Sequence, residues 1–72
     1  MRQYVMPDQA LAERLAKGRR NVGLTQIDIA RRVRVSESRI AKIETARVSP
    51  APELVAEIEA VFAEAKKQRV RT

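Results

Sequence analysis

The chain has 72 residues, a length that allows one small domain and no second hydrophobic core. Its 15 Lys and Arg residues outnumber nine Asp and Glu residues, which gives a formal net charge of +6 at pH 7. The sequence contains neither Cys nor His, so disulfides, thiolate metal sites and the commonest general base are excluded. We therefore expect no metal, no other cofactor and no enzyme activity.

The basic excess is typical of a protein that binds nucleic acid. Aromatic residues make up only 3% of the chain, too few for a protein that stacks single-stranded bases on aromatic rings. No apolar run approaches the ~20 residues of a membrane-spanning helix. Residues 1–7 lack the apolar stretch of a signal peptide. We expect a cytoplasmic protein that does not bind membranes.

Charged residues are distributed unevenly along the chain. Residues 14–47 carry ten basic and three acidic side chains, whereas residues 48–64 carry four Glu and no basic side chain. A basic tail follows at residues 66–72. This pattern predicts one surface that faces a polyanion and an acidic surface that is turned away from it.

Apolar residues recur at helical spacing through most of the chain, which predicts an all-α domain of four to five helices. The first helix is expected between the N-cap Asp8 and the helix-terminating Gly23. Its inward stripe consists of Leu11, Leu15 and Val22, with the small Gly18 beside them. A capping box at residues 25–28 begins the second helix, which ends near Val33. The second helix buries Ile29, Ala30 and Val33.

Ser36 is the expected N-cap of the third helix, which turns Ile40 and Ile43 inward. Residues 45–50 form a connector without helical periodicity. Prolines are tolerated only in the first turn of a helix, so the fourth helix is expected to start near residues 50–52. Its inward stripe consists of Leu54, Val55, Ile58, Val61, Phe62 and Ala65.

The strongest local signal spans residues 26–45, where two short helices are joined by about three residues, as in a helix-turn-helix. The small Ala30 stands where the two helices cross closely. The informative stretches are Leu24-Thr25-Gln26, Ile29-Ala30, Val35-Ser36, Ile40 and Ile43-Glu44. Over residues 10–62 this pattern resembles the lambda repressor/Cro-like, or XRE-type, helix-turn-helix DNA-binding family. We expect one compact domain of this kind over residues 1–72, with its core at about 8–66.

The resemblance implies that the third helix lies in the major groove of double-stranded DNA. Base contacts are then expected from Glu37, Ser38, Arg39 and Lys42. Lys42 would donate to guanine and Glu37 would accept from a cytosine amine. Contacts to the DNA backbone are expected from Gln26, Arg20, Arg31, Arg34, Thr45 and Arg47. The alternative is that these side chains are simply the solvated face of a small domain.

The family pattern also implies a largely buried ion pair between Arg19, late in the first helix, and Glu44, at the end of the third. Two departures from the pattern lie at helix ends. Arg34 stands where the family usually has Gly, and Thr45-Ala46 stands where it usually has Asn-Gly. Either Arg34 adopts a positive φ, at a cost of about 1–2 kcal/mol, or the turn differs.

The apolar stripe of the fourth helix is wider than one small core requires. Val55, Val61, Phe62 and Tyr4 are therefore candidates for an isologous homodimer contact, with membership of the core as the alternative. Two copies would place their third helices ~34 Å apart, which is one turn of DNA.

These features favour a sequence-specific transcriptional regulator that binds a pseudo-palindromic operator. We expect a dimeric repressor, or a controller-type dual regulator. The acidic residues of the fourth helix are a candidate contact for RNA polymerase. The alternative function is a protein-interaction module of the same fold, such as an antitoxin or an anti-activator.

Overall fold

The computed structural model describes residues 8–70, and the side chains of residues 8–68. This part of the chain forms four helices and no strand. The helices are α1 (Gln9–Asn21), α2 (Gln26–Val33), α3 (Glu37–Glu44) and α4 (Pro52–Val70). The predicted compact all-α fold is confirmed, with four helices rather than five over these residues. None of the four combines the length and the apolar character that crossing a membrane requires.

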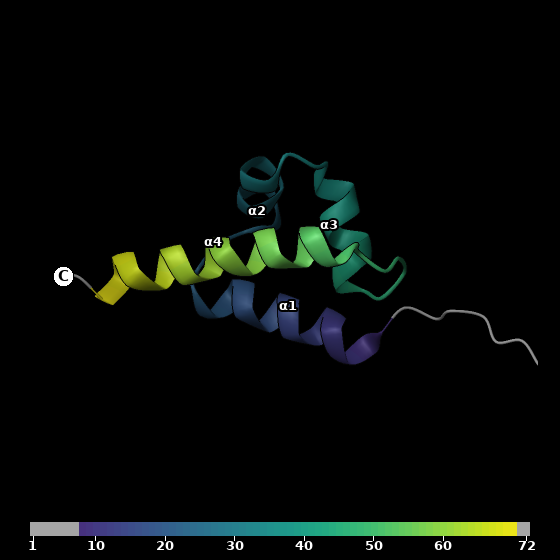
Figure 1. Ribbon diagram of the computed structural model, residues 1–72, viewed down its shortest axis with the longest axis horizontal. Helices are drawn as coiled ribbons and strands as arrows, with labels where there is room; N and C mark the ends of the chain where they lie inside the picture. Colours follow the sequence, from purple (N-terminus) through teal and green to yellow (C-terminus); the bar gives the residue numbers. More distant parts are fainter. Residues whose placement is uncertain (1–7, 71–72) are drawn as a thin grey trace, which may run out of the picture.

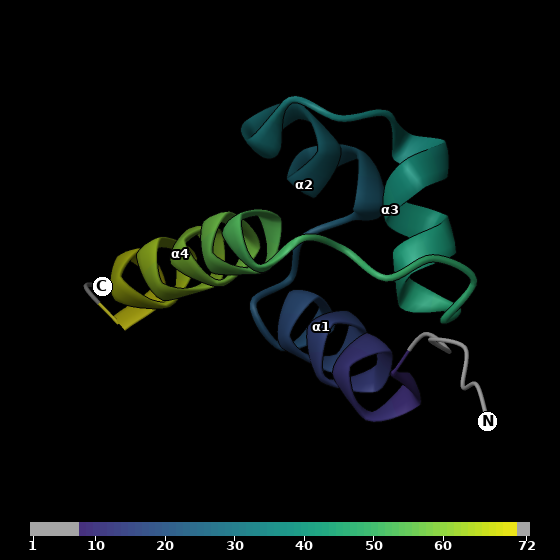
Figure 2. The same cartoon turned by 45° about the vertical axis from the view of Figure 1, so that its right-hand side comes forward.

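The four helices form two pairs that share one core. α1 and α4 lie along one another, and α2 and α3 pack together above them (Figures 1 and 2). α4 contacts both α1 and α2, while α3 contacts α1 and α2. The centre is occupied by side chains that are at most 3% exposed, namely Leu15, Ile29, Ile40, Ile43 and Ile58. Each helix therefore contributes at least one fully buried aliphatic side chain, as the predicted stripes require.

α4 uses two adjacent faces to cover the core. Val61 lines a groove with Val33 of α2, whereas Phe62 packs against Gly18 of α1. A Cβ atom placed on Gly18 would lie 2.7 Å from the Phe62 ring, so glycine is required for α1 and α4 to approach this closely. The helix continues as far as Val70, so residues 66–70 of the predicted basic tail are helical.

The first three helices end in the same way, with one residue in the left-handed region of φ. These residues are Gly23 with φ of 75°, Arg34 with 63° and Ala46 with 61°. The amide that follows each of them donates back to a carbonyl five residues earlier. These bonds are Leu24 to Arg19 (3.1 Å), Val35 to Ala30 (3.0 Å) and Arg47 to Lys42 (2.8 Å). This is the hydrogen bond of the Schellman motif, which satisfies a carbonyl left over at the helix end.

Only the first of these ends uses glycine. A side chain at positive φ brings its Cβ close to the backbone carbonyl, at a cost of roughly 1–2 kcal/mol. Arg34 and Ala46 therefore carry backbone strain, one at the turn before α3 and the other immediately after it. The sequence left open whether the turn at Arg34 has a different geometry. Arg34 adopts the left-handed conformation, with φ of 63° and ψ of 44°, so the first of the two possibilities holds.

We predict that Ala46→Gly stabilises the domain by about 1 kcal/mol, because glycine adopts φ of 61° without the Cβ contact. In a domain of this size that corresponds to a rise in Tm of about 4–8 °C. The control is Ala60→Gly, the same substitution at an exposed position inside α4. It should destabilise by about 1 kcal/mol. Equal effects of the two substitutions in thermal unfolding would contradict this account.

Candidate nucleic-acid interface

The start of α2 is fixed by a reciprocal pair of hydrogen bonds. The Thr25 hydroxyl accepts from the Asp28 amide at 3.1 Å, and the Asp28 carboxylate accepts from the Thr25 amide at 2.9 Å. At the start of α3, the Ser36 hydroxyl accepts from the Arg39 amide at 3.1 Å. These caps satisfy amides that have no partner within the helix, and they set where each short helix begins. The register of α3, and with it the choice of outward residues, follows from Ser36.

α3 presents its polar side chains to solvent. Ile40 and Ile43 are 1% and 2% exposed, which turns the opposite face of the helix outward. The structure places all four predicted base-contacting residues in exposed positions on that helix, namely Glu37, Ser38, Arg39 and Lys42. No ion pair to Arg39 or Lys42 occurs among residues 8–68. Two cationic groups and two acceptor groups are thus available on one short helix.

A hydrogen-bonded network holds α3 to the rest of the domain. Arg19 donates from Nε to Oε2 of Glu44 at 2.8 Å and from Nη2 to Oε1 at 3.1 Å. Its remaining nitrogen, Nη1, donates to the Leu24 carbonyl at 2.8 Å. The two charged side chains are 13% and 8% exposed. The network thus joins the end of α1, the turn before α2 and the end of α3 in one nearly buried cluster.

Gln26 and Thr45, both expected to contact DNA phosphates, make hydrogen bonds within the protein. The Gln26 amide nitrogen donates to Oε1 of Glu44 at 2.9 Å. This bond orients the Gln26 side chain at the start of α2 and leaves its second amide hydrogen for a phosphate. The Thr45 hydroxyl donates to the Ala41 carbonyl at 2.9 Å. A phosphate contact from Thr45 would therefore require its hydroxyl to leave that carbonyl.

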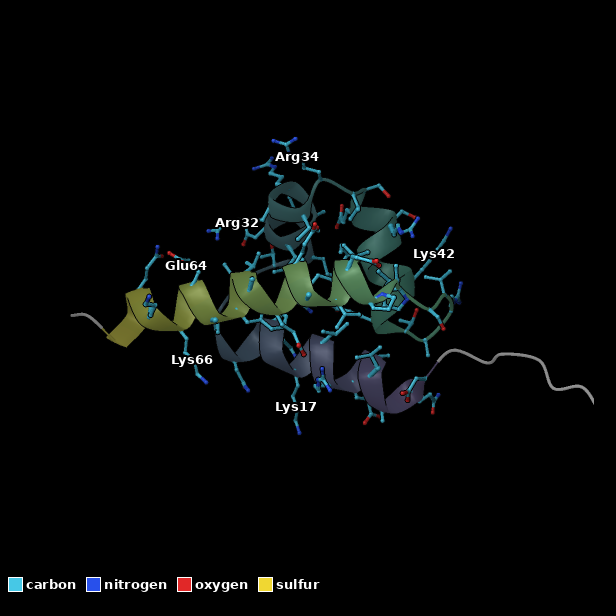
Figure 3. The ribbon with its side chains drawn as sticks, viewed as in Figure 1. Lys17, Arg32, Arg34, Lys42, Glu64 and Lys66 are labelled. Atoms are coloured by element: carbon cyan, nitrogen blue, oxygen red, sulfur yellow. The ribbon has the colours of Figure 1, made fainter. Side chains whose placement is uncertain are left out.

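The predicted arginines are all exposed but do not share one surface. Arg31 lies in the last turn of α2, Arg34 follows it, and Arg47 lies in the connector after α3. Arg20 lies on α1, beside a groove that also touches Glu44. Arg32 and Arg34 project from the α2 side, Lys42 projects from α3, and Lys17 projects from α1 on the opposite side of the molecule (Figure 3). The structure therefore gathers cations around α2 and α3 without making the whole surface one basic face.

Two features near α3 escaped the sequence analysis. A groove of about 280 Å³ brings Val48 of the connector alongside Ser38 and Lys42 of α3. Ile27 is the one large apolar side chain that is clearly exposed among the described residues, at 42%. It lies off the Ile29, Ala30 and Val33 stripe, and this offset was visible in the sequence as a signal for an outward apolar residue.

The predicted dimer residues fall in different places. Val55, Val61 and Phe62 are half-buried and pack against the core. Val61 and Phe62 line separate grooves, towards α2 and α1 respectively, so one flat contact does not include both. Tyr4 lies outside the described residues.

No three Asp or Glu side chains in the described part of the chain come together as a metal site would require.

The pKa of Asp28 is lowered by its capping interactions. The Thr25 amide contributes most, the Thr25 hydroxyl next, and the charges of Arg31 and Arg32 act in the same direction. The folded state therefore favours the carboxylate more than the unfolded state does, which stabilises the domain above the usual Asp pKa of about 4. This stabilisation is lost as the pH falls through the lower folded-state pKa.

We predict that Asp28→Asn makes the domain less sensitive to acid. The asparagine oxygen can still accept from the Thr25 amide, but it has no charge to lose. The measurement compares urea midpoints of the two proteins at about pH 7 and pH 3. The fall in midpoint should be smaller for the variant, and equal falls would show that the Asp28 cap contributes nothing to acid unfolding.

The two ion pairs among residues 8–68 provide a matched stability test. Glu44→Ala leaves the Arg19 guanidinium nearly buried and unpaired, which should cost about 3–5 kcal/mol. Arg14→Ala removes the other ion pair, between Arg14 and Glu59. The Arg14 side chain is 61% exposed and the Glu59 side chain is 40% exposed. This substitution should cost less than about 1 kcal/mol. Comparable losses in urea unfolding would mean that burial does not distinguish the pairs.

Comparison with protein families places this arrangement in a known class. A family model described as a helix-turn-helix domain matches residues 10–63. The matched range covers α1 except its first residue, all of α2 and α3, and continues into α4. No curated protein matches the chain at a significant level. The chain thus belongs to the helix-turn-helix domain family, of the Cro/C1 or XRE-like type, whose members bind DNA.

Proposed function

We propose that this protein is a sequence-specific transcriptional regulator, a repressor that binds a pseudo-palindromic operator as a dimer. The observation that carries the proposal is the exposed polar face of α3 on a helix whose end is locked by the Arg19–Glu44 ion pair. A helix of eight residues would be marginal alone. The lock presents its side chains to DNA at a fixed angle, which base recognition requires.

The chemistry of this face suits the major groove. Lys42 has three donors for the O6 and N7 acceptors of guanine, and Arg39 can donate in the same way or to a phosphate. Glu37 can accept from the amino group of cytosine, and Ser38 can pair with several bases. Each good contact discriminates between bases by about 1–3 kcal/mol. Such a face distinguishes a short half-site rather than a long sequence.

Affinity would come largely from the phosphates. Arg31 and Arg34 are exposed at the end of α2, and Arg47 is exposed in the connector on the other side of α3. Gln26 stands at the amino end of α2, where free amides and the helix dipole favour an anion. These groups position α3 without reading sequence. The proposal therefore includes a strong dependence of binding on salt.

We predict that selection from random duplex DNA, at near-physiological salt, yields a two-fold symmetric motif for the natural protein. In a Ser38→Ala/Lys42→Ala variant the half-site should change or disappear, because two groups that read bases are gone. Sequence-blind, salt-sensitive binding by the natural protein would contradict the proposal. It would leave a protein-interaction module, such as an antitoxin, as the function to pursue.

The matched control is Arg31→Ala, which removes one exposed cation from outside α3. It should weaken binding to all sequences alike and leave the selected motif unchanged. The slope of log K against log salt should become shallower by about 1, as expected for the loss of one phosphate contact. A changed motif in this variant would place base reading on α2 instead.

A further inference from the structure

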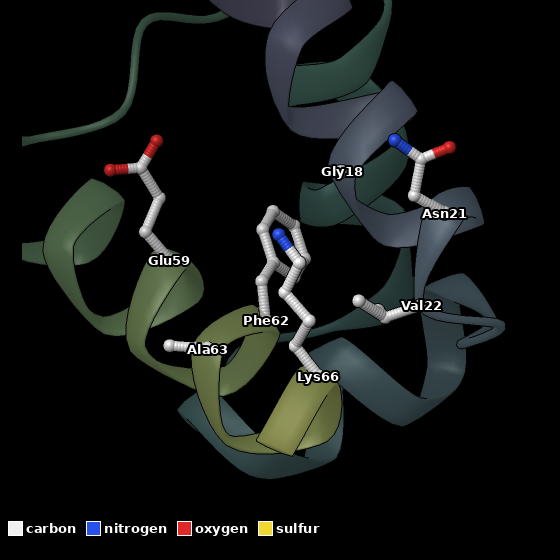
Figure 4. A pocket seen from close by; sticks show the side chains of 7 residues that line it. All are labelled: Gly18, Asn21, Val22, Glu59, Phe62, Ala63 and Lys66. Atoms are coloured by element: carbon white, nitrogen blue, oxygen red, sulfur yellow. The ribbon is translucent and has the colours of Figure 1, made fainter. Parts of the chain in front are cut away.

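A hollow, mainly apolar surface lies between α4 and the end of α1. Its volume is about 530 Å³. The α1 side is formed by Gly18, Asn21 and Val22, and the α4 side by Glu59, Phe62, Ala63 and Lys66. In Figure 4 Phe62 stands in the middle, Glu59 lies to its left, and the Lys66 side chain extends from below and crosses the Phe62 ring in this view. This hollow lies on the α1 side of α4, away from α2.

The four α4 residues of this hollow form one continuous face of the helix. Their spacing is i, i+3, i+4 and i+7, which is the pattern of a helix face that packs against another helix. The centre of the face is apolar and its two ends carry opposite charges. Glu59 and Lys66 are about 10 Å apart along the helix, given a rise of 1.5 Å per residue, and among residues 8–68 Glu59 pairs with Arg14 instead of Lys66.

The charges are symmetric about the midpoint of the face. Glu59 precedes the point between Phe62 and Ala63 by as many residues as Lys66 follows it. A two-fold axis through that point would run α4 of a second copy antiparallel to the first. Glu59 of each copy would then face Lys66 of the other, and each Phe62 would face the small Ala63 of the other. The same surface is thus complementary to itself, as an isologous contact requires.

We propose that this face of α4 is the interface of a homodimer, with two antiparallel α4 helices and two reciprocal Glu59–Lys66 ion pairs. The proposal rests on the dimeric operator binding proposed above and gives it an interface. Of the dimer residues that the sequence predicted, this interface includes Phe62. It leaves out Val61, which lies on the α2 side of the helix.

The charged residues at the two ends of the face, Glu59 and Lys66, are placed where a second copy could reach them. Arg14 of α1 donates from Nε to Oε2 of Glu59 at 2.9 Å, and its Nη2 donates to the same oxygen. Glu59 is thereby held at the edge of the hollow, while Oε1 has no hydrogen bond from the described residues. Lys66 is exposed and has no ion-pair partner within residues 8–68. Its ammonium group is thus available to a carboxylate of the second copy.

The proposed axis also agrees with the spacing of DNA half-sites. α3 lies at or beyond the amino end of α4 in both views (Figures 1 and 2). From Pro52 to the midpoint between Phe62 and Ala63 the helix rises about 16 Å, at 1.5 Å per residue. An antiparallel pair doubles this, which separates the amino ends of the two α4 helices, and the α3 helices beside them, by about 32 Å. One turn of DNA is about 34 Å.

The test uses two charge reversals that should fail separately and succeed together. Lys66→Glu places a carboxylate against Glu59 of an identical copy, and Glu59→Lys places an ammonium group against Lys66. Each variant alone should self-associate at least about tenfold more weakly than the natural chain in sedimentation equilibrium, because like charges meet twice. In an equimolar mixture one of the two contacts keeps the natural pairing and the other has its charges exchanged. Both contacts in the mixed dimer are therefore attractive.

The mixed dimer pairs an acidic face with a basic face. Position 59 of each copy faces position 66 of the other, so a Lys66→Glu chain, with acids at both positions, meets a Glu59→Lys chain, with bases at both. All four charges then pair with their opposites, and a heterodimer should form with an affinity close to that of the natural dimer. Recovery in the mixture requires the face that carries positions 59 and 66 in one copy to meet the same face of the other copy.

Matched controls carry a charge reversal elsewhere on α4. Glu57→Lys and Glu64→Lys are exposed and lie on the opposite side of α4 from the proposed face, so they should dimerise as the natural chain does. Undiminished self-association of Lys66→Glu, or no recovery in the mixture, would overturn this interface. So would a natural chain that stays monomeric at high micromolar concentration and on palindromic DNA. Selection of a DNA motif by the natural chain tests the proposed function separately, since loss of dimerisation leaves half-site recognition in place.

Discussion

The orientation of α3 depends on a carboxylate at an unfavourable position. Glu44 is the last residue of α3, where the negative end of the helix dipole opposes an anion, and it is also nearly buried. Neither penalty is tolerable without donors, and Arg19 and Gln26 provide three hydrogen bonds to its two oxygens. Because these donors come from two other helices, the carboxylate is stable in one arrangement of the three helices only. Directional charge pairing thus supplies what apolar packing alone supplies poorly, a unique angle for a short helix.

The two strained residues enclose the same helix. Arg34 lies two residues before the N-cap of α3, and Ala46 follows its C-cap. Strain of this kind persists only where the surroundings over-determine the backbone. Here Val35 and Val48 pack on the core on either side of α3, and backbone hydrogen bonds close both turns. At Arg34 the residue that strains the turn also adds an exposed cation beside α3, so under the proposed DNA binding backbone stability would be exchanged for attraction to phosphate.

Local signals in the sequence predicted the fold well. Asp8, Ser36 and the capping box that begins at Thr25 mark helix starts through bonds that need only neighbouring residues, and all three form. The family resemblance directed attention to Arg19 and Glu44, a pair that no local pattern indicates. The sequence did not predict which hydrogen-bond acceptor a polar side chain uses when several lie within reach in the folded protein.

The Gln26 amide and the Thr45 hydroxyl each have an acceptor inside the protein, and a linear sequence does not show which acceptor wins. The division of the α4 stripe had the same cause. Val61 and Phe62 are adjacent in the sequence, yet α2 covers the first and α1 approaches the second.

Recognition by one α3 helix is limited by its length. The four outward side chains proposed to contact bases would read only a few base pairs, and at about 1–3 kcal/mol for each good contact the discrimination would fall short of what a genome requires. Joining two copies adds their discrimination without lengthening the helix. A dimer contact would have to leave the DNA-binding surface free, and the proposed α4 contact would do so because the hollow beside Phe62 is lined by α1 and α4 rather than by α2 or α3. The proposed two-turn helix contact would bury less than the ~1,600 Å² of a standard interface, so such a dimer would form weakly. Under the proposed function, weak dimerisation joined to paired half-sites would make operator occupancy rise steeply with protein concentration, and a small DNA-binding domain would then respond to its own abundance.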